Sequence, residues 1–425
     1  MGLHAKKKKR SRAVSTVLDN DDLLSEVLLR VALPTSLVRA ALVCRRWLRV
    51  AADPAFLLRF HDSHPPCLLG FYVHSARLRG VPKFAPMPGL PPELAAGALR
   101  AGKALDAFAA ETSMAFVLYC LDGHLLVRLR HRDVVLSPMR RSAGRGAVVV
   151  VPPPPLSASL YDHFTTWLKR RDEFPGRRPG VIVCAAWRRR GDQTISTYEL
   201  RGGAWHEQHN NNTSSSSSAP AKTKLPDPPT PNPLDMPYFF LRCGGKIYLV
   251  SSASVIADLR CSASASEEPS SHLTFVALPD GVNYKLWNER KLSAWTDSSV
   301  IYLIKVDAER LQLCAWLYQL DAKEASWSLE DTHCLRTLLA ASGITTTTSL
   351  FSRDRRLDVV IQAVGHLCVF LQVGADVLHI HIKNRTVEKV YTVTPEDGDF
   401  VMLAPLTMIF PPVFPRHDSQ RSVSA

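Results

Sequence analysis

Between positions 20 and 62, apolar residues recur with the spacing of amphipathic helices. Two acidic residues, Asp21 and Asp22, come first, which is favourable at a helix N-terminus. The apolar positions that follow predict one helical face, made of Leu23, Leu24, Val27, Leu28 and Val31. Pro34 is expected to end this helix.

Two further helices are expected before position 62. Thr35 or Ser36 can cap the second helix. Its apolar face comprises Leu37, Val38, Ala41, Leu42 and Leu48, with Trp47 near its end. Asp53 and Pro54 have the residue types of an N-cap and a first helical turn. The third helix then follows through Phe56, Leu57 and Phe60.

After about residue 65, short apolar runs alternate with turn residues. Each run has the length and the residue types of a strand. The expected strands are Leu68–Val73, Phe116–Cys120, Leu125–Leu129, Val134–Leu136, Val148–Val151, Val181–Trp187, Thr194–Leu200, Lys246–Val250, Leu273–Leu278, Ser299–Lys305, Leu311–Leu317, Val359–Ala363, Leu367–Val373, Val377–Ile382 and Val387–Val393. Arg290–Trp295 is ambiguous, and His333–Ala341 fits one or two helical turns.

So many short strands predict a propeller or a large sandwich, because a small closed barrel needs fewer. A propeller blade takes about 40–50 residues, which leaves room for roughly six or seven blades. The expected fold class is therefore a small all-α, three-helix N-terminal domain followed by a large all-β domain that is propeller-like.

Composition marks the boundaries of these parts. Residues 1–17 form a basic leader that is expected to be disordered, and the helical domain spans 18–62. The β-rich domain spans 66–415, with an insert rich in Asn, Ser and Pro at 208–236 that is also expected to be disordered. Residues 416–425 form a polar tail. The apolar stretch 359–375 is interrupted by polar residues, so no membrane span is expected.

Charge and cysteine content narrow the class of protein. Hydrophobic residues make up 46% of the chain and charged residues 21%, as in a globular protein with a real core. Of the net charge of +13, six positive charges lie in the leader, so the body is only mildly basic and nucleic acid is not the expected partner. Nine cysteines occur without a C-x-x-C pair, and no apolar stretch follows the basic N-terminus, which indicates reduced thiols in a chain that is not exported.

The sequence has no pattern that indicates catalysis. Phosphate-binding loops, nucleophile elbows and zinc-protease motifs are missing. The run from His61 to His64 holds the residue types of a hydrolase triad, but adjacent residues cannot converge on one point. His379 and His381 share one strand face without an apparent third ligand, and Glu396–Asp399 is best interpreted as an acidic turn. The sequence therefore predicts no catalytic residue, no metal and no cofactor.

The basic leader contains a candidate nuclear-import signal, since a flexible group of cations can bind an acidic receptor groove. It consists of Lys6, Lys7, Lys8, Lys9 and Arg10. A solubilising tail is the alternative interpretation. The expected location is the nucleus, the cytoplasm or both.

The helical segment carries a family resemblance. The runs DDLLSEVLLRV (21–31), LVRAALVCRRW (37–47) and AADPAFL (51–57) resemble, in this order, the F-box of large plant families. Farther along, LLGFYV (68–73), WSLEDT (327–332) and KVY (389–391) are similar to segments of the F-box-associated, propeller-like domain of the same proteins.

This resemblance implies a function in protein ubiquitination. An F-box binds the small adaptor subunit of an SCF-type cullin–RING ubiquitin ligase, and through it the cullin, while the second domain captures a target protein. Transfer chemistry belongs to other subunits, so the chain itself is expected not to be an enzyme. The residues expected to contact the adaptor, or to support those contacts directly, are Leu23, Leu24, Val27, Leu28, Leu37, Val38, Val43 and Trp47. The identity of the target does not follow from the sequence.

One departure from the family pattern concerns the start of the first helix. The family commonly has Leu-Pro directly before the acidic pair, whereas Asp19 and Asn20 stand here. Asn20 can cap the helix in place of the proline.

Three alternatives to a ligase receptor stay open. One is an F-box protein with weakened adaptor binding that acts outside the ligase, and another is a nuclear nucleic-acid-binding protein that uses the basic leader. The third is an enzyme or a carbohydrate-binding module on a propeller scaffold.

Overall fold

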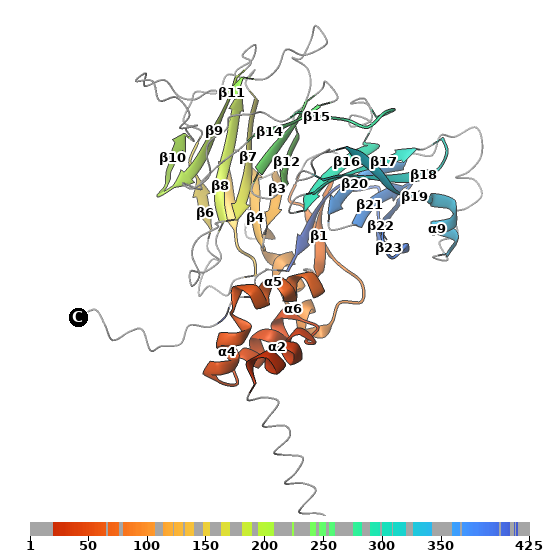
Figure 1. Ribbon diagram of the computed structural model, residues 1–425. Helices are drawn as coiled ribbons and strands as arrows, with labels where there is room; N and C mark the ends of the chain where they lie inside the picture. Colours follow the sequence, from red (N-terminus) through yellow and green to blue (C-terminus); the bar gives the residue numbers. More distant parts are fainter. Residues whose placement is uncertain are drawn as a thin grey trace, which may run out of the picture.

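The computed structural model places a helical domain beside a large β-domain (Figure 1). It describes residues 20–64, 67–75, 80–106, 114–121, 123–130, 132–139, 148–153, 163–170, 181–188, 194–207, 223–224, 239–243, 246–251, 255–259, 275–282, 290–297, 300–307, 309–319, 326–341, 359–365, 368–398, 401–408, 412 and 414. The basic leader, nearly all of the insert at 208–236 and the tail at 416–425 lie outside these residues.

The helical domain, called the head below, is built from four short helices. They are α2 (Asp21–Leu29), α3 (Pro34–Ala41), α4 (Arg45–Ala51) and α5 (Pro54–Ser63). Asn20 caps α2 as expected, because its Oδ1 accepts hydrogen bonds from the backbone N–H groups of Asp22 at 2.8 Å and Leu23 at 3.1 Å. Asp53 caps α5 in the same way through the N–H of Phe56, at 3.0 Å.

The prediction of three helices is wrong at the second one. That helix ends at Ala41, Cys44 is fully extended, and α4 begins at Arg45. The bend lets α4 pack against α2 and α5 as well as α3, and this packing outweighs the helical periodicity of the segment. Pro34 also differs from expectation: it is the first residue of α3, with Leu33 as N-cap, so neither Thr35 nor Ser36 caps this helix.

Among the described residues, the strands form six antiparallel sheets. The first sheet contains β2 (Lys83–Pro86), β1 (Leu68–Ser75) and β24 (Val401–Thr407). The second contains β3 (Ala115–Leu121), β4 (His124–Leu129), β5 (Arg132–Leu136) and β6 (Val149–Val151). The third contains β10 (Ala204–Glu207), β9 (Thr194–Arg201), β8 (Val181–Arg188) and β7 (His163–Arg170), and β11 (Thr223–Lys224) pairs with β9. The fourth sheet contains β12 (Phe239–Cys243), β13 (Lys246–Ser251), β14 (Val255–Leu259) and β15 (Phe275–Ala277). The fifth contains β16 (Leu292–Asp297), β17 (Val300–Asp307), β18 (Gln312–Gln319) and β19 (Trp327–Cys334). The sixth contains β20 (Val359–Gly365), β21 (Cys368–Val373), β22 (Asp376–His381) and β23 (Thr386–Thr392).

The sheets are arranged as the blades of a propeller. One strand of each sheet contacts a strand of the next sheet, in the order β12, β16, β20, β24, β3 and β7. Apolar cores lie between adjacent sheets, where Leu126 shares a cluster with Leu168, and Ile304 shares one with Leu371. A two-sheet sandwich would have one continuous core instead. The expectation of a propeller-like domain is therefore confirmed, and the alternative of a large sandwich is wrong.

The two ends of the β-domain meet in its first sheet. Strand β24, near the end of the chain, pairs with β1 from Leu68 opposite Thr407 to Ser75 opposite Val401. The ring of Phe71 lies 5.4 Å from that of Phe370, which joins the first sheet to the sixth. A late strand and an early strand of the chain therefore share one sheet.

The expected strands were found wherever the structure describes them, but several elements were missed. The ambiguous segment at 290–295 contributes to strand β16, and His333–Ala341 contains the short helix α9 (Leu335–Ala341). The strands that were not expected are β2, β7, β10, β11, β12, β14, β19 and β24, and the helix α6 (Pro92–Lys103) was not expected either. Strand β11 pairs with β9 although it lies within the insert 208–236, which was expected to be disordered. Edge strands such as β19 keep many polar residues exposed, so they lack a clear apolar pattern.

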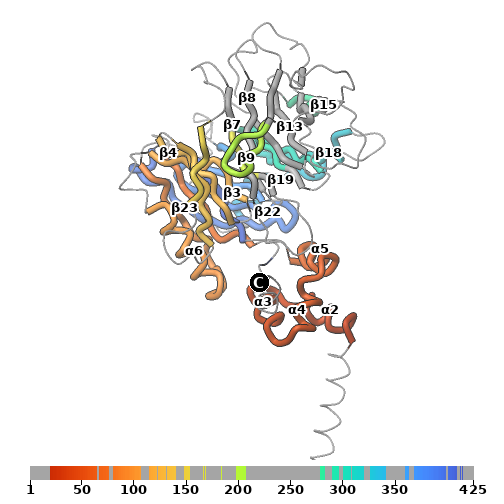
Figure 2. Tube along the Cα trace, turned by 90° about the vertical axis from the view of Figure 1, so that its left-hand side faces the viewer, coloured from red at the N-terminus to blue at the C-terminus, as the bar shows by residue number. Residues whose placement is uncertain are grey.

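Helix α6 packs against β1 and β2 of the first sheet, and both views show α2–α5 together at one end of the molecule (Figures 1 and 2). The hydroxyl of Tyr72 in β1 donates a hydrogen bond of 2.8 Å to the carbonyl oxygen of Ala101 in α6. Leu94 and Ala98 of α6 pack with Leu69 of β1 and, from the head, with the side chain of Leu33. Helix α6 therefore contacts both the first sheet and the head.

Candidate protein-binding interface

The head has a small apolar core of its own. Side chains from all four helices meet there, and they are buried at Leu24, Leu28, Leu37, Ala41, Ala51, Phe56 and Phe60. The rings of Phe56 and Phe60 are stacked with centroids 6.1 Å apart. Burial of each large apolar side chain stabilises the fold by about 1.5–3 kcal/mol. These residues therefore hold the helices together and are not available to a partner.

A second set of apolar side chains in the head stays exposed. Leu23 and Val27 lie one turn apart on α2, with 44% and 39% of their surface exposed. Leu42 and Val43 in the bend between α3 and α4, and Leu58 on α5, are exposed by 61%, 67% and 67%. Five such side chains on a domain of this size leave apolar surface that a partner protein can cover.

The structure divides the expected contact residues into two groups. Leu23, Val27 and Val43 are exposed, and Val38 and Trp47 are half-buried, so these five can contact a partner. The remaining three are buried in the core and can act only as supports: Leu24, Leu28 and Leu37.

Two exposed residues, Leu42 and Leu58, were not expected at the interface. Leu42 had been assigned to the buried face of a continuous helix, and it is exposed because α3 ends one residue earlier. Leu58 lies two positions from both Phe56 and Phe60, on the other face of α5. That spacing is a sequence signal that could have identified it.

Ion pairs tie α2 to the helices beside it. The Asp21 carboxylate lies 2.7 Å from Nε of Arg46 and 3.0 Å from a guanidinium nitrogen of Arg49, both on α4. The hydrogen bond from Arg46 is the main reason that the pKa of Asp21 lies below its usual value, against a smaller opposing effect of burial. Arg59 of α5 pairs with Glu26 of α2. Exposed pairs contribute little stability, but they orient the helices that carry the exposed apolar side chains.

The run His61–His64 has a structural role. Nε2 of His64 lies 2.6 Å from the carbonyl oxygen of Leu29, which can only accept, so the ring donates and fastens α5 to the end of α2. The same ring contacts Phe60 with centroids 4.7 Å apart. His64 is therefore engaged in helix packing, whereas Asp62 and Ser63 are exposed.

The histidines and acidic turn of the β-domain also have packing partners. The ring of His379 lies 5.0 Å from that of Phe370, and burial lowers the pKa of His379. Asp397 accepts hydrogen bonds from Thr394 in its own turn and from Tyr391 near the end of β23. Within the described part of the chain, no three His, Cys, Asp or Glu side chains gather as a metal site would require.

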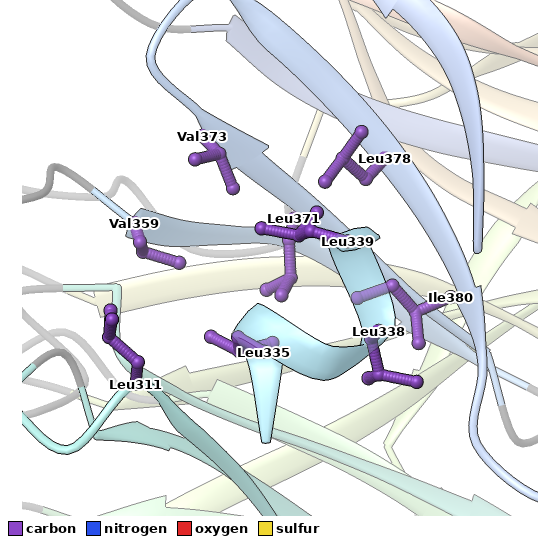
Figure 3. Close-up of a pocket in the computed structure, with 9 residues that line it drawn as sticks. All are labelled: Leu311, Leu335, Leu338, Leu339, Val359, Leu371, Val373, Leu378 and Ile380. Atoms are coloured by element: carbon purple, nitrogen blue, oxygen red, sulfur yellow. The ribbon is translucent and has the colours of Figure 1, made fainter. Parts of the chain in front are cut away.

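The apolar pocket below α9 belongs to the core of the fifth and sixth sheets (Figure 3). Leu335, Leu338 and Leu339 of α9 point toward Leu371 and other strand residues around it. The space between them holds no more than about one water molecule. It is a packing gap beneath a covering helix and is too small for an organic ligand.

Comparison with known proteins decides the family. Residues 21–62 match the F-box-like family, and residues 116–414 match the family described as "F-box protein AT5G49610-like, beta-propeller". The chain belongs to the F-box proteins with this propeller. The head is its F-box, and the six sheets belong to its propeller domain. None of the described helices is long and apolar enough to cross a membrane.

Solved structures give only distant likenesses. BBS1N in complex with ARL6DN is 12% identical over 67% of this chain and 66% of that chain, with a TM-score of 0.26. The WD40 domain of SCAP from fission yeast is 6% identical over 64% and 42%, with a TM-score of 0.18. The GH93 α-L-arabinofuranosidase of Fusarium graminearum is 12% identical over 69% and 92%, with a TM-score of 0.29. The chain covers less than two thirds of the first two. Among curated proteins, no sequence matches this chain.

Proposed function

We propose that this F-box protein is a substrate-recognition subunit of an SCF-type ubiquitin ligase. Its F-box binds the small adaptor subunit and through it the cullin, and its propeller domain binds the target protein. The observation that carries this proposal is the set of exposed apolar side chains on a domain that matches the F-box family: Leu23, Val27, Leu42, Val43 and Leu58.

The arrangement of the two domains supports a division of labour. The F-box lies where β1 begins and β24 ends, since Leu68 is paired with Thr407. The other end of the same strand pair, at Ser75 and Val401, lies roughly 23 Å away at about 3.3 Å per residue. The blade edges remote from the F-box are therefore free for a target while the F-box holds the adaptor. A rigid β-domain can present variable loops there without loss of its core.

A catalytic role for the chain is not proposed. A non-catalytic receptor is typical of this domain architecture. Its contribution to ubiquitination is to hold a target near the transferring enzyme, which raises the effective concentration of target lysines.

A binding experiment with purified adaptor tests the proposal. We expect micromolar or tighter binding by the full chain, and a loss of at least about thirtyfold for Leu58→Asp combined with Val43→Asp, because a central apolar contact contributes about 2 kcal/mol or more. Leu99→Asp is the matched control, since Leu99 lies on α6 outside the F-box and is 66% exposed. Absence of wild-type binding, or equal binding by all variants, would rule out the proposed function.

We further propose that the cluster Lys6–Arg10 directs the protein to the nucleus. The support is its charge and its position before the folded F-box. Replacing these five residues with serine and imaging the tagged full-length protein tests the idea. Unchanged distribution between nucleus and cytoplasm would contradict it.

A further inference from the structure

The F-box is attached to the β-domain at two points that are distant in sequence. One is the passage from α5 into β1, between His64 and Leu68. The other is Phe414, which follows β24 in the sequence and packs against the core of the four helices. The contacts of Phe414 were not expected from the sequence, because no helical or strand pattern includes this residue.

At the joint between the two domains, each domain contributes an apolar side chain that packs against the other domain. Leu33 of the head packs into a cluster of the β-domain with Leu69, Leu94 and Met408. In return, Phe414 of the chain after β24 packs against the head core. A backbone hydrogen bond of 2.9 Å, from Met408 N–H to the carbonyl oxygen of Cys67, joins the two chain segments at the base of the joint.

We propose that the contacts of Met408 and Phe414 act together as a strut that fixes the orientation of the F-box relative to the propeller. One chain crossing between two domains permits rotation, and domain motion is the default for a small polar interface. A second attachment, in which the apolar side chain of Phe414 packs against the head core, opposes that rotation. Met408 directly follows β24. Pairing of β24 with β1 and orientation of the head therefore depend on the same end of the β-domain.

The consequence for ubiquitin transfer rests on the proposed function. For a ligase receptor, a fixed joint keeps a captured target at a constant distance and angle from the adaptor. The joint itself is a property of this chain alone and can be tested without any partner.

Phe414→Ala in the full chain tests the strut, with Phe414→Leu as the control that keeps an apolar side chain. We expect amides of α2–α5 to exchange about tenfold faster in Phe414→Ala, since truncating a packed aromatic side chain weakens its surroundings. Amides of β1 and β24 should keep their protection. Small-angle X-ray scattering should show a larger maximum dimension for Phe414→Ala and wild-type values for Phe414→Leu.

A second variant covers the case in which Phe414→Ala unfolds the head. Leu33→Ala removes the reciprocal contact, and Leu33 lies outside the buried core of the head, so the four helices should stay folded. The strut is supported if this variant also expands in scattering while its circular dichroism is unchanged. Wild-type scattering for Leu33→Ala, together with wild-type scattering or simple unfolding for Phe414→Ala, would overturn it. Failure to bind the adaptor has no bearing on these measurements.

Discussion

Lys83 and Asp397 lie 314 positions apart in the sequence, yet Nζ of Lys83 is 3.4 Å from Oδ1 of Asp397. Lys83 belongs to β2, and Asp397 lies in the turn between β23 and β24. The pair therefore joins the start of the β-domain to its end. Oδ2 of the same carboxylate accepts hydrogen bonds from the Tyr391 hydroxyl at 2.9 Å, the Thr394 N–H at 2.9 Å and the Thr394 hydroxyl at 2.8 Å.

Asp397→Asn should destabilise the protein by about 1–3 kcal/mol, because a buried group would lose part of its hydrogen bonding. Glu396→Gln is the matched control: Glu396 contacts the same lysine, but its side chain is 83% exposed against 3% for Asp397. Thermal unfolding of both variants checks this. Equal midpoints for the two variants would show that the pair does not hold the sheets together.

The same carboxylate makes stability sensitive to acid. Burial acts to raise the pKa of Asp397, but the hydrogen bonds from Thr394 and Tyr391 and the charge of Lys83 outweigh it, so the pKa lies below 3.8. A lowered pKa in the folded state contributes stability above pH 3.8 that is lost as the pH falls further. The destabilising effect of Asp397→Asn should therefore shrink below pH 3.8, as urea unfolding at pH 3 and pH 6 would show. An undiminished effect at the lower pH would contradict this account.

Gly70→Ala should be strongly destabilising. A Cβ at Gly70 would overlap the carbonyl oxygen of Ala85 and lie 2.9 Å from Cα of Pro86, both in β2. Overpacking against backbone costs about 3 kcal/mol or more, because strands cannot separate without losing their hydrogen bonds. Gly102→Ala in α6 is the control, where a Cβ meets its nearest atom at an ordinary 3.4 Å and helix propensity favours alanine. Chemical unfolding of both variants would show whether position 70, unlike position 102, tolerates no side chain.

His74 should make the protein less stable in mild acid. It is buried on β1 with its ring 4.3 Å from that of Phe116, and burial lowers its pKa from 6.5 to about 4. Between these two values the unfolded chain binds more protons than the folded one, so the free energy of unfolding falls as the pH falls. Between pH 7 and pH 5 the expected loss is about 2 kcal/mol.

The measurement is urea unfolding of wild type and His74→Leu at these two pH values. Burial lowers the pKa of His333 and His379 as well, so wild type and variant will both lose stability in acid. The contribution of His74 is the difference between the two losses. No difference would mean that His74 has an ordinary pKa in the folded protein.

The cysteines should differ in reactivity. Cys334 is exposed, and hydrogen bonds from Thr337 lower its pKa, whereas burial raises the pKa of Cys67 and raises that of Cys368 to about 11. The thiolate is the reacting species, so iodoacetamide at pH 8 should modify Cys334 about tenfold faster than the other two. Peptide mass spectrometry over a time course gives the three rates. Faster modification of Cys368 would contradict this order.

Local patterns in the sequence identified the head well. The caps at Asn20 and Asp53 and the apolar helix faces that include Leu24, Leu28 and Phe60 were expected, because caps and helical periodicity depend on residues within one or two turns. The bend at Cys44 was not expected, since it results from packing of α4 on α2 and α5. Exposure of Leu42 followed from that bend.

Patterns along the chain were enough to show where helices give way to strands, which residues turn the chain, and that the F-box carries more apolar residues than it can bury. These properties depend on neighbours along the chain. The folded structure was needed to show that β24 pairs with β1, that Lys83 contacts Asp397 and that Phe414 packs against the head. Such contacts join segments more than 300 residues apart. No local pattern encodes them, because their partners are chosen by the packing of the whole domain.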